Sequence, residues 1–117
     1  MKTLSGIRLG VSVGLFAFCV GCSHTHRVVN TGDSMLYGVT VQSGEKKFGY
    51  GYLPPKAFKS YNGSMRITRS PAPIVSWKTT ENGEPVKQDV KMDSEPRGRE
   101  VVFELDGKTV RVTFNDR

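Results

Sequence analysis

The chain has 117 residues, of which 17 are basic and 11 acidic, so that its formal net charge is +6. Hydrophobic residues make up 37% of the chain and aromatic residues 9%, which is the composition of a globular protein and excludes a disordered one. This length supports one small domain with a single core and excludes a multidomain protein.

The first residues of the chain have the pattern of a secretory signal. The segment MKTLSGIR carries Lys2 and Arg8 and no acidic residue, and an uncharged run follows from Leu9 to Gly21. This run is about a dozen residues long, which suits a signal-peptide core and falls short of the roughly 20 residues that span a bilayer. We therefore predict that residues 1–21 are a signal peptide and that the chain is exported.

The end of this signal resembles the lipobox of bacterial lipoproteins. The segment Cys19-Val20-Gly21-Cys22 places a small residue before a cysteine, although Leu is usual where Cys19 stands. The resemblance implies that Cys22 takes a diacylglycerol and becomes the mature N-terminus. Ser23 follows, and by resemblance to lipoprotein sorting in Gram-negative bacteria a non-acidic residue there implies the outer membrane, with the protein facing the periplasm.

Three alternatives remain open for this segment. An ordinary signal peptidase could cut nearby and leave Cys22 free, the apolar run could stay as an uncleaved anchor, or Cys19 and Cys22 could form a redox or metal pair. If Cys22 is lipidated, no cysteine is left for a disulfide, so the domain must be stable on its core alone even in an oxidising compartment.

Residues 22–27 are expected to be a polar tether between the lipid and a domain that covers residues 28–117. His24 and His26 lie within this tether and would point the same way in an extended chain. Two ligands on a tether do not make a stable metal site, which needs three or four. We therefore predict no metal site here.

The rest of the chain shows short runs in which apolar residues alternate with polar ones, separated by turn residues, which predicts strands. Gly49 and Gly51 lie within the expected strand 46–53 and indicate a sheet edge or a bulge. Pro54 and Pro55 lack amide hydrogens and mark a loop or an edge crossing after that strand. The segment NGSMRITRSPAP is expected to be a long connection between sheets.

The second half of the chain has the clearer alternation, with Trp77 expected at the centre of the core. Asn82-Gly83 and Asp106-Gly107 are pairs that tolerate positive φ and predict two tight hairpin turns. The residues expected to face inward are Val75, Trp77, Val86, Val90, Met92, Val101, Phe103, Leu105, Val110, Val112 and Phe114.

Seven to eight short strands at this spacing predict an all-β fold, a single small antiparallel β-sandwich that follows the lipoprotein signal peptide. A small barrel is the alternative closure. The segments NTG, GYLPP, PAP and NGE, taken with the Trp-containing strand, resemble small bacterial lipoproteins with an immunoglobulin-like or transthyretin-like β-sandwich. The likeness extends from Asn30 to Phe114 and rests on turn and core positions, so it implies a fold and no activity.

No constellation of catalytic residues is evident in the domain. A nucleophile with a base needs a histidine, and the two histidines of the chain both lie in the expected tether. Glu100 and Glu104 are expected to point outward, as partners of Arg111 or Lys108 across the last hairpin. We therefore predict a protein that is not an enzyme, with no catalytic residue, no metal and no cofactor.

Basic residues are concentrated between Glu45 and Glu81, where no acidic residue occurs. If these basic residues share a face, they would attract an anionic partner such as lipid headgroups or an acidic protein; otherwise they are ordinary solvated residues of alternating strands. Binding residues often lie on loops of a rigid scaffold, which favours Arg66 and Arg69, with Lys56 and Lys59 next.

A cluster of aromatic residues beside the double proline is a further candidate, either as a binding surface or as core. Its members are Phe48, Tyr50, Tyr52, Phe58 and Tyr61. The function that we expect is a lipid-anchored envelope module that binds or supports another component without catalysis. Its expected partners are the membrane, through the anchor, and another envelope protein or anionic lipid, with no nucleic acid. The alternative is an inhibitor or accessory subunit of an envelope enzyme, secretion machine or receptor.

Overall fold

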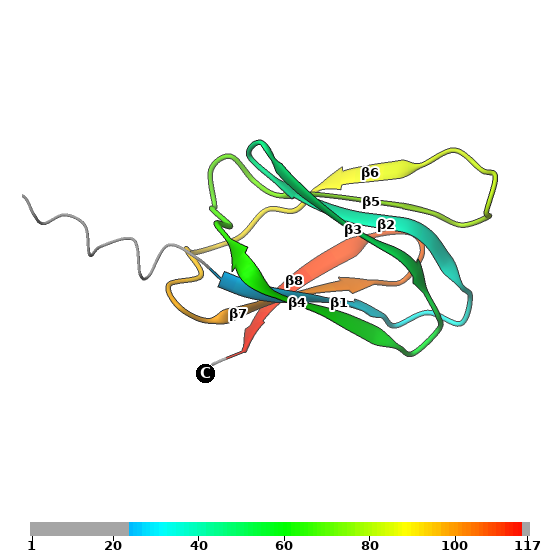
Figure 1. Cartoon of the computed structure of the whole chain (residues 1–117), viewed down its shortest axis with the longest axis horizontal. Coiled ribbons are helices and arrows are strands. Elements are labelled where there is room, and N and C mark those ends of the chain that lie inside the picture. The colour runs from blue at the N-terminus through cyan, green and yellow to red at the C-terminus, as the bar shows by residue number, and fades with distance from the viewer. Residues whose placement is uncertain (1–23, 116–117) are drawn as a thin grey trace, which may run out of the picture.

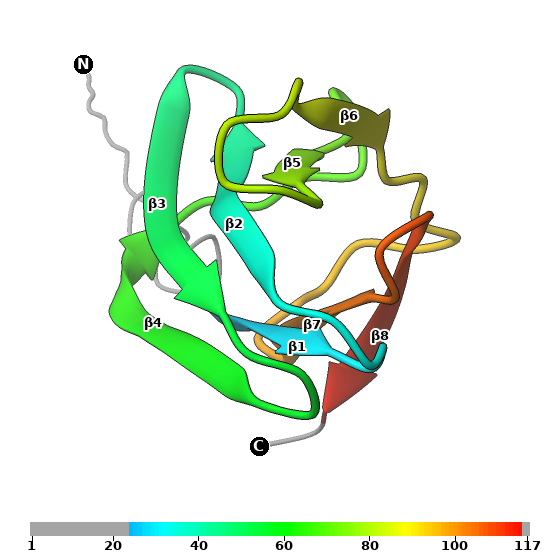
Figure 2. The same ribbon diagram turned by 90° about the vertical axis from the view of Figure 1, so that its right-hand side faces the viewer.

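The computed structural model describes residues 24–115, which form eight strands in two facing sheets (Figure 1). The strands are β1 (His24–Asn30), β2 (Leu36–Ser43), β3 (Lys46–Leu53), β4 (Phe58–Met65), β5 (Ile74–Lys78), β6 (Val86–Asp89), β7 (Glu100–Leu105) and β8 (Val110–Asn115). The sheet orders are β4-β1-β7-β8 and β3-β2-β5-β6. This confirms the all-β sandwich of seven to eight strands (Figure 2). The described segments include no helix that is long and apolar enough to cross a bilayer.

The signal peptide predicted over residues 1–21 and the lipidation site predicted at Cys22 lie outside the described residues. The predicted tether over residues 22–27 overlaps them in part. Its boundary at residue 28 is wrong, because β1 begins at His24. His26 is fully buried and pairs with Tyr61 of β4 and Val101 of β7. A histidine breaks the apolar alternation that would have extended this strand toward the N-terminus.

One pair of strands is parallel, so the expectation of a wholly antiparallel sandwich is wrong at this place. β1 runs parallel to β7, from His26 opposite Val101 to Asn30 opposite Leu105. A parallel pair needs a long crossover connection, which the five intervening strands supply. Alternation shows which face of a strand is buried but not the direction of its neighbour, so the sequence could not distinguish the two arrangements.

Two glycines produce bulges in the β2–β3 pair. Gly38 and Gly51 both have positive φ, at 55° and 72°, and the register of the pair shifts beside them. This confirms the edge or bulge predicted for β3, which is an edge strand. Beyond the bulge Leu53 faces the core, whereas Tyr52 is 56% exposed and packs edge-on against Tyr37.

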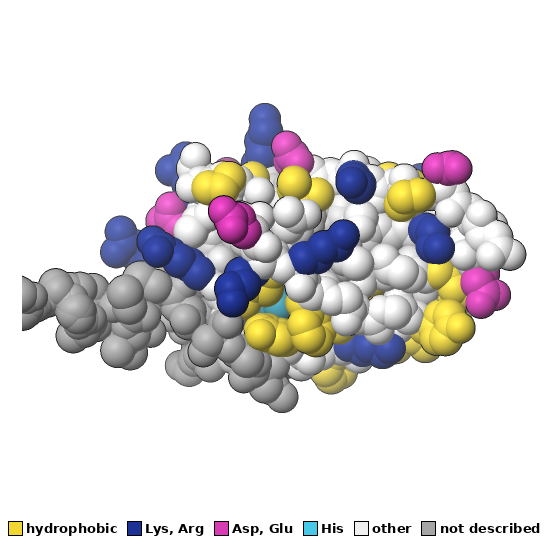
Figure 3. Space-filling model, turned by 45° about the horizontal axis from the view of Figure 1, so that its top comes forward, with side chains coloured by type: hydrophobic (Ala, Val, Ile, Leu, Met, Phe, Trp, Pro, Cys, Tyr) yellow, Lys and Arg dark blue, Asp and Glu magenta, His cyan; other side chains and the backbone are white. Residues whose placement is uncertain are grey.

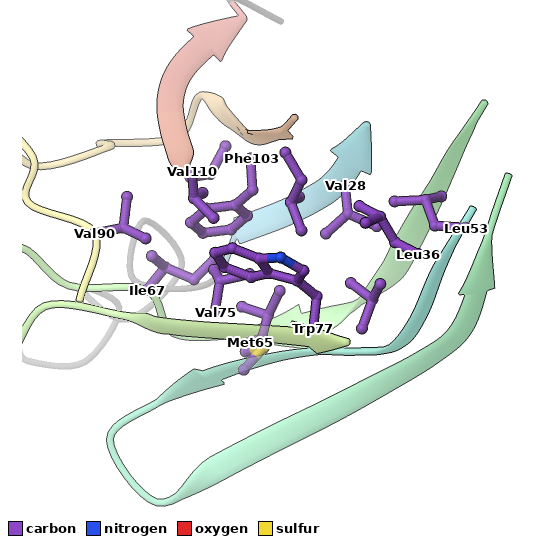
Figure 4. Packing of buried hydrophobic residues seen from close by; sticks show 14 of the residues in the cluster. Val28, Leu36, Leu53, Met65, Ile67, Val75, Trp77, Val90, Phe103 and Val110 are labelled. Atoms are coloured by element: carbon purple, nitrogen blue, oxygen red, sulfur yellow. The ribbon is translucent and has the colours of Figure 1, made fainter. Parts of the chain in front are cut away.

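The core lies between the sheets, with Trp77 at its centre as predicted (Figure 4). The Trp77 side chain is fully buried, and its Nε1 donates a hydrogen bond to the carbonyl oxygen of Gly107 at 3.2 Å. Most of the predicted inward positions are confirmed. They are Val75, Val90, Met92, Val101, Phe103, Leu105 and Val110, together with the partly buried Val112 and Phe114.

Val86 is the exception among the predicted core residues, because it is 40% exposed at the start of the short edge strand β6. The hairpin predicted at Asp106-Gly107 is confirmed. The backbone N–H groups of Thr109 and Lys108 each donate to Asp106 Oδ1 at 2.8 Å, and these bonds lower the pKa of Asp106. The hairpin predicted around Asn82-Gly83 is present, since β5 and β6 pair antiparallel, but the predicted tight turn is wrong because the connection spans residues 79–85 without positive φ.

Asn30 ties three chain segments together at the end of β1. Its side-chain Nδ2 donates to the carbonyl oxygens of Ser34 at 2.8 Å and Leu53 at 2.9 Å. Its Oδ1 accepts the backbone N–H of Gly32 at 2.9 Å. Asn30 is fully buried, and its bond to Leu53 is buried while those to Ser34 and Gly32 are partly buried. The sequence motif NTG is therefore a corner that holds the β1–β2 connection against β3.

Asn30→Ala is expected to lower the free energy of unfolding by about 2 kcal/mol, because the substitution leaves the buried carbonyl group of Leu53 without this donor and also removes the bonds to Ser34 and Gly32. Urea unfolding followed by circular dichroism measures this change. Gln42→Ala is the matched control, since the Gln42 amide makes one exposed hydrogen bond, to Gly44. The control should change stability by less than about 0.5 kcal/mol. Equal losses in the two variants would contradict the corner's role.

Candidate functional site

The two ends of the sandwich differ in charge. At the end where β1 begins, the connections over residues 44–45, 66–73 and 90–99 carry five basic and three acidic residues. At the opposite end, the four other connections carry two basic and four acidic residues. Lys and Arg side chains gather at the first end, which we call the basic end (Figure 3).

A hollow of about 410 Å³ opens at the basic end, between the β2–β3 turn and the β4–β5 connection. We call it the basic hollow, and its lining residues are Ser43, Gly44, Lys46, Arg66, Thr68, Ser70 and Pro71. Lys46 and Arg66 are both exposed at its rim. Lys46 begins β3 and Arg66 follows β4 of the other sheet, and they come together because β3 begins and β4 ends at this end of the sandwich.

Local geometry holds both sides of the basic hollow in place. Gly44 has a φ of 61°, which suits the tight turn that reverses the chain from β2 into β3. On the other side, the hydroxyl of Thr68 donates a hydrogen bond to the carbonyl oxygen of Pro71 at 3.0 Å. The two cations and the Ser70 hydroxyl at this hollow suit an anionic group such as a phosphate.

The structure does not bring the four predicted binding residues together. Arg66 lines the basic hollow, whereas Arg69 links two connections at the same end. The Arg69 side chain donates to the carbonyl oxygen of Met92 at 3.1 Å, and its backbone N–H donates to Glu95 Oε1 at 3.2 Å. Arg69 is therefore held by its own neighbours, and Arg66 is the freer of the two predicted arginines.

Lys56 and Lys59 lie away from the basic hollow. Lys56 is at the opposite end, where its Nζ lies 2.9 Å from the carbonyl oxygen of Thr31 and 3.3 Å from a carboxylate oxygen of Asp33. Lys59 lies on β4, and its Nζ donates to the carbonyl oxygen of Tyr50 on β3 at 3.1 Å. Both lysine side chains therefore already have partners within the domain.

The ion pairs between described residues lie outside the basic end's connections. They are Arg27 with Glu100, Lys56 with Asp33, and Arg111 with Glu104. The last of these confirms the pair predicted across the final hairpin. By contrast Lys46, Lys47 and Arg66 form no ion pair with any residue in the range 24–115, so their positive charges remain open to an outside partner.

His26 lies in a cage of aromatic rings. Its ring centroid lies 5.1 Å from that of Tyr61, 5.7 Å from that of Tyr50 and 5.9 Å from that of Phe103. Neither of its ring nitrogens has a hydrogen-bond partner among the described residues. Burial lowers the pKa of His26 from 6.5 to about 4, and the negative charge of Glu100 opposes this shift in part. His26 is therefore a neutral packing residue at neutral pH.

The aromatic cluster singled out in the sequence divides into two groups. Phe48, Tyr50 and Tyr61 are partly buried and pack against one another around His26. Tyr52 and Phe58 are 56% and 55% exposed. The guanidinium carbon of Arg27 lies 4.6 Å from the centroid of the Phe58 ring, which gives that exposed ring a cation–π contact.

A second hollow, of about 680 Å³, runs between β6 and β8, the edge strands of the two sheets. Its lining includes Gln88, Val90, Val112 and Phe114. The Gln88 carboxamide bonds both backbone groups of Val110, since its Nε2 donates to the carbonyl oxygen at 2.9 Å and its Oε1 accepts the N–H at 3.0 Å. The side chain thus takes the place of a neighbouring strand at one residue of β8.

Backbone groups alternate in direction along a strand, so the N–H and C=O of Val112 and Phe114 point to the same side of β8 as those of Val110. The side between β6 and β8 therefore presents backbone groups that an extended chain segment can pair with. Sequence alternation identified Val112 and Phe114 as inward residues but carried no signal for the Gln88 contact. No group of three His, Cys, Asp or Glu side chains suited to a metal occurs within residues 24–115.

Comparison with known proteins supports the fold alone. No family model matches the chain, and none of the curated proteins matches it. Among solved structures, the NMR structure of a protein from Eubacterium rectale is similar, with a TM-score of 0.53 and 16% sequence identity. The match covers 92% of this chain and 97% of that one. At this identity the two chains share an architecture, and no site residue or activity follows from the likeness.

Proposed function

We propose that this chain is a bacterial envelope lipoprotein that acts as a non-catalytic binding or structural module. In this proposal Cys22 carries a diacylglycerol, and the sandwich faces the periplasm from the outer membrane. We propose further that its domain is of the immunoglobulin-like or transthyretin-like kind found in the small lipoproteins that the sequence resembles. The proposal does not include an enzymatic activity, a metal or a cofactor.

The observation that carries the proposal is the position at which the fold begins. β1 starts at His24, two residues after Cys22, and all eight strands lie within residues 24–115. Cleavage before Cys22 would therefore leave every strand of residues 24–115 in place, on a domain attached directly to its lipid. A signal segment that ends where the first strand begins fits the organisation of a lipoprotein.

The surroundings of His26 support the non-catalytic part of the proposal. A general base must reach its substrate and have a pKa near the working pH. The His26 side chain is fully buried between aromatic rings, and its pKa is lowered to about 4. It therefore neither reaches a substrate nor accepts a proton readily at neutral pH.

Cys22→Ser is expected to move the protein from the membrane fraction to the soluble periplasmic fraction, because it removes the thiol that takes the lipid. Fractionation followed by immunoblotting measures the distribution, and mass spectrometry of the N-terminal peptide shows the lipid directly. Cys19→Ser is the matched control and should keep the protein in the membrane fraction. An unmodified Cys22 in the wild-type membrane fraction would overturn the anchoring proposal.

The hollow between β6 and β8 favours the alternative of an accessory subunit or inhibitor, since its open backbone groups suit an extended segment of a partner protein. Stoichiometry distinguishes the two functions. An inhibitor would abolish the activity of its target enzyme at equal molar amounts. A structural module would leave that activity unchanged while remaining bound.

A further inference from the structure

The basic end is the end of the sandwich nearest the proposed anchor. β1 begins there at His24, and only Ser23 lies between His24 and Cys22. Two residues span at most about 7 Å when fully extended. If Cys22 is lipidated, the start of β1 at the basic end therefore lies within about 7 Å of the residue that carries the lipid.

This distance decides whether charge at the basic end interacts with lipid headgroups. The Debye length at physiological ionic strength is about 8 Å, which is comparable to the reach of a tether of two residues, so such a tether holds the basic end close to the membrane's surface potential. A long tether would place the same charges beyond that range, where salt would screen them. Because the distance from Cys22 to β1 is short, the charge of the basic end affects how the domain interacts with the lipid headgroups.

The cations at this end are available for such an interaction. Lys46, Lys47 and Arg66 are exposed and form no ion pair with the described residues. Lys46 and Arg66 flank the basic hollow, whose rim also carries Thr68 and Ser70. Because the Thr68 hydroxyl already donates to Pro71, the hollow offers two positive charges and the hydroxyl of Ser70 to an anionic group of the size of a phosphate.

The opposite end does not offer the same surface. Its connections carry more acidic than basic residues, and Lys56 is already paired with Asp33. An anionic membrane would attract the basic end and repel the other. The two effects favour the same orientation, with the long direction of the strands leading away from the membrane.

We propose that the basic end binds the anionic phospholipid headgroups of the leaflet that holds the anchor, with Lys46 and Arg66 receiving a headgroup phosphate at the basic hollow. This inference rests on the proposed lipidation of Cys22, which places the surface at the membrane. The contact adds a second attachment to the acyl chains and fixes the orientation of the domain. The hollow between β6 and β8 then remains open to the periplasm.

The first experiment measures the charge interaction without the lipid. The chain from residue 22 with Cys22→Ser retains every described strand, and its binding to phosphatidylcholine vesicles is compared with and without phosphatidylglycerol. Binding is expected only to the anionic vesicles and should weaken as salt is added. Lys46→Gln with Arg66→Gln should lower the partition coefficient about 30-fold, since each cation near an anionic surface contributes roughly fivefold.

Lys87→Gln with Lys108→Gln is the matched control, because it removes the same charge from exposed residues outside the basic end. This control should leave most of the binding intact. Equal loss in the two double variants would show that net charge alone drives binding and would overturn the proposal. Absence of binding to anionic vesicles at low salt would overturn it as well.

The second experiment uses the unaltered lipidated chain, so that it does not depend on the folding of a variant. An amine-reactive reagent is applied to the protein in vesicles that contain phosphatidylglycerol, and labelling of each lysine is read by mass spectrometry. Lys46 and Lys47 should be labelled several-fold more slowly than in detergent, whereas Lys87 and Lys108 should be unchanged. Equal rates at all four would contradict the orientation. An unlipidated Cys22 would instead refute the anchoring proposal, while the first experiment still tests the charged surface.

Discussion

Trp77→Ala is expected to lower the free energy of unfolding by about 3–5 kcal/mol, the range found for large aromatic residues removed from a core. Trp77 is fully buried on β5 and packs between the two sheets (Figure 4). The substitution leaves a cavity and also removes the donor that bonds the carbonyl oxygen of Gly107. A domain of this size has a total stability of about 5–15 kcal/mol, so much of the variant would be unfolded at elevated temperature.

Urea unfolding measured by far-ultraviolet circular dichroism tests this prediction, because Trp77 is the single tryptophan and its fluorescence is lost with it. Trp77→Phe is a graded control that keeps an aromatic ring and should lose less than the alanine variant. Phe58→Ala is the surface control, since Phe58 is 55% exposed. If the alanine variants at positions 77 and 58 unfolded at the same urea concentration, Trp77 would not be the centre of the core.

Acid is expected to destabilise the protein by as much as about 3.5 kcal/mol through His26 alone. The pKa of His26 is about 4 in the folded protein against 6.5 as its ordinary value. Because the folded pKa is the lower one, the unfolded chain binds the proton more tightly. Stability from this residue is therefore complete above pH 6.5 and is lost as the pH falls toward 4, at about 1.4 kcal/mol for each unit of pKa difference.

His26→Phe separates this effect from the protonation of carboxylates. Phenylalanine fits the surrounding rings of Tyr50, Tyr61 and Phe103 and carries no ionisable group. The variant should keep its unfolding free energy constant between pH 7 and 5, where the wild type already loses stability and most carboxylates are still charged. Parallel curves for the two proteins over this interval would show that His26 titrates normally and is not buried as described.

Alternation of apolar residues was sufficient to predict the strands and most of the core, because a sheet with one buried face and one exposed face requires it. β5 and β7 illustrate this, since Val75, Trp77, Phe103 and Leu105 are all fully buried as expected. Alternation did not reveal the two features that depend on partners far along the chain. These are the parallel pairing of β1 with β7 and the burial of His26 among aromatic rings from other strands.

The candidate site was predictable only in part for the same reason. The acid-free segment contains both Lys46 and Arg66, but nothing in it indicated that these two residues lie on opposite sides of the basic hollow, since Lys46 begins β3 and Arg66 follows β4 of the other sheet. The same segment also suggested Lys56 and Lys59. Lys56 lies at the opposite end of the sandwich, and Lys59 lies on β4 and contacts β3. Which basic residues share a surface can be predicted only after the strand order is known.

The parallel alignment of β1 with β7 also affects the order in which the chain can fold. His26 pairs with Val101, 75 positions later, so this part of the sheet forms only when nearly the whole domain is present. Contacts between such distant residues slow folding, because a long loop must close before the contacts stabilise it. A chain that crosses a membrane N-terminus first would expose β1 long before its second neighbour emerges, and would need protection from aggregation during that interval.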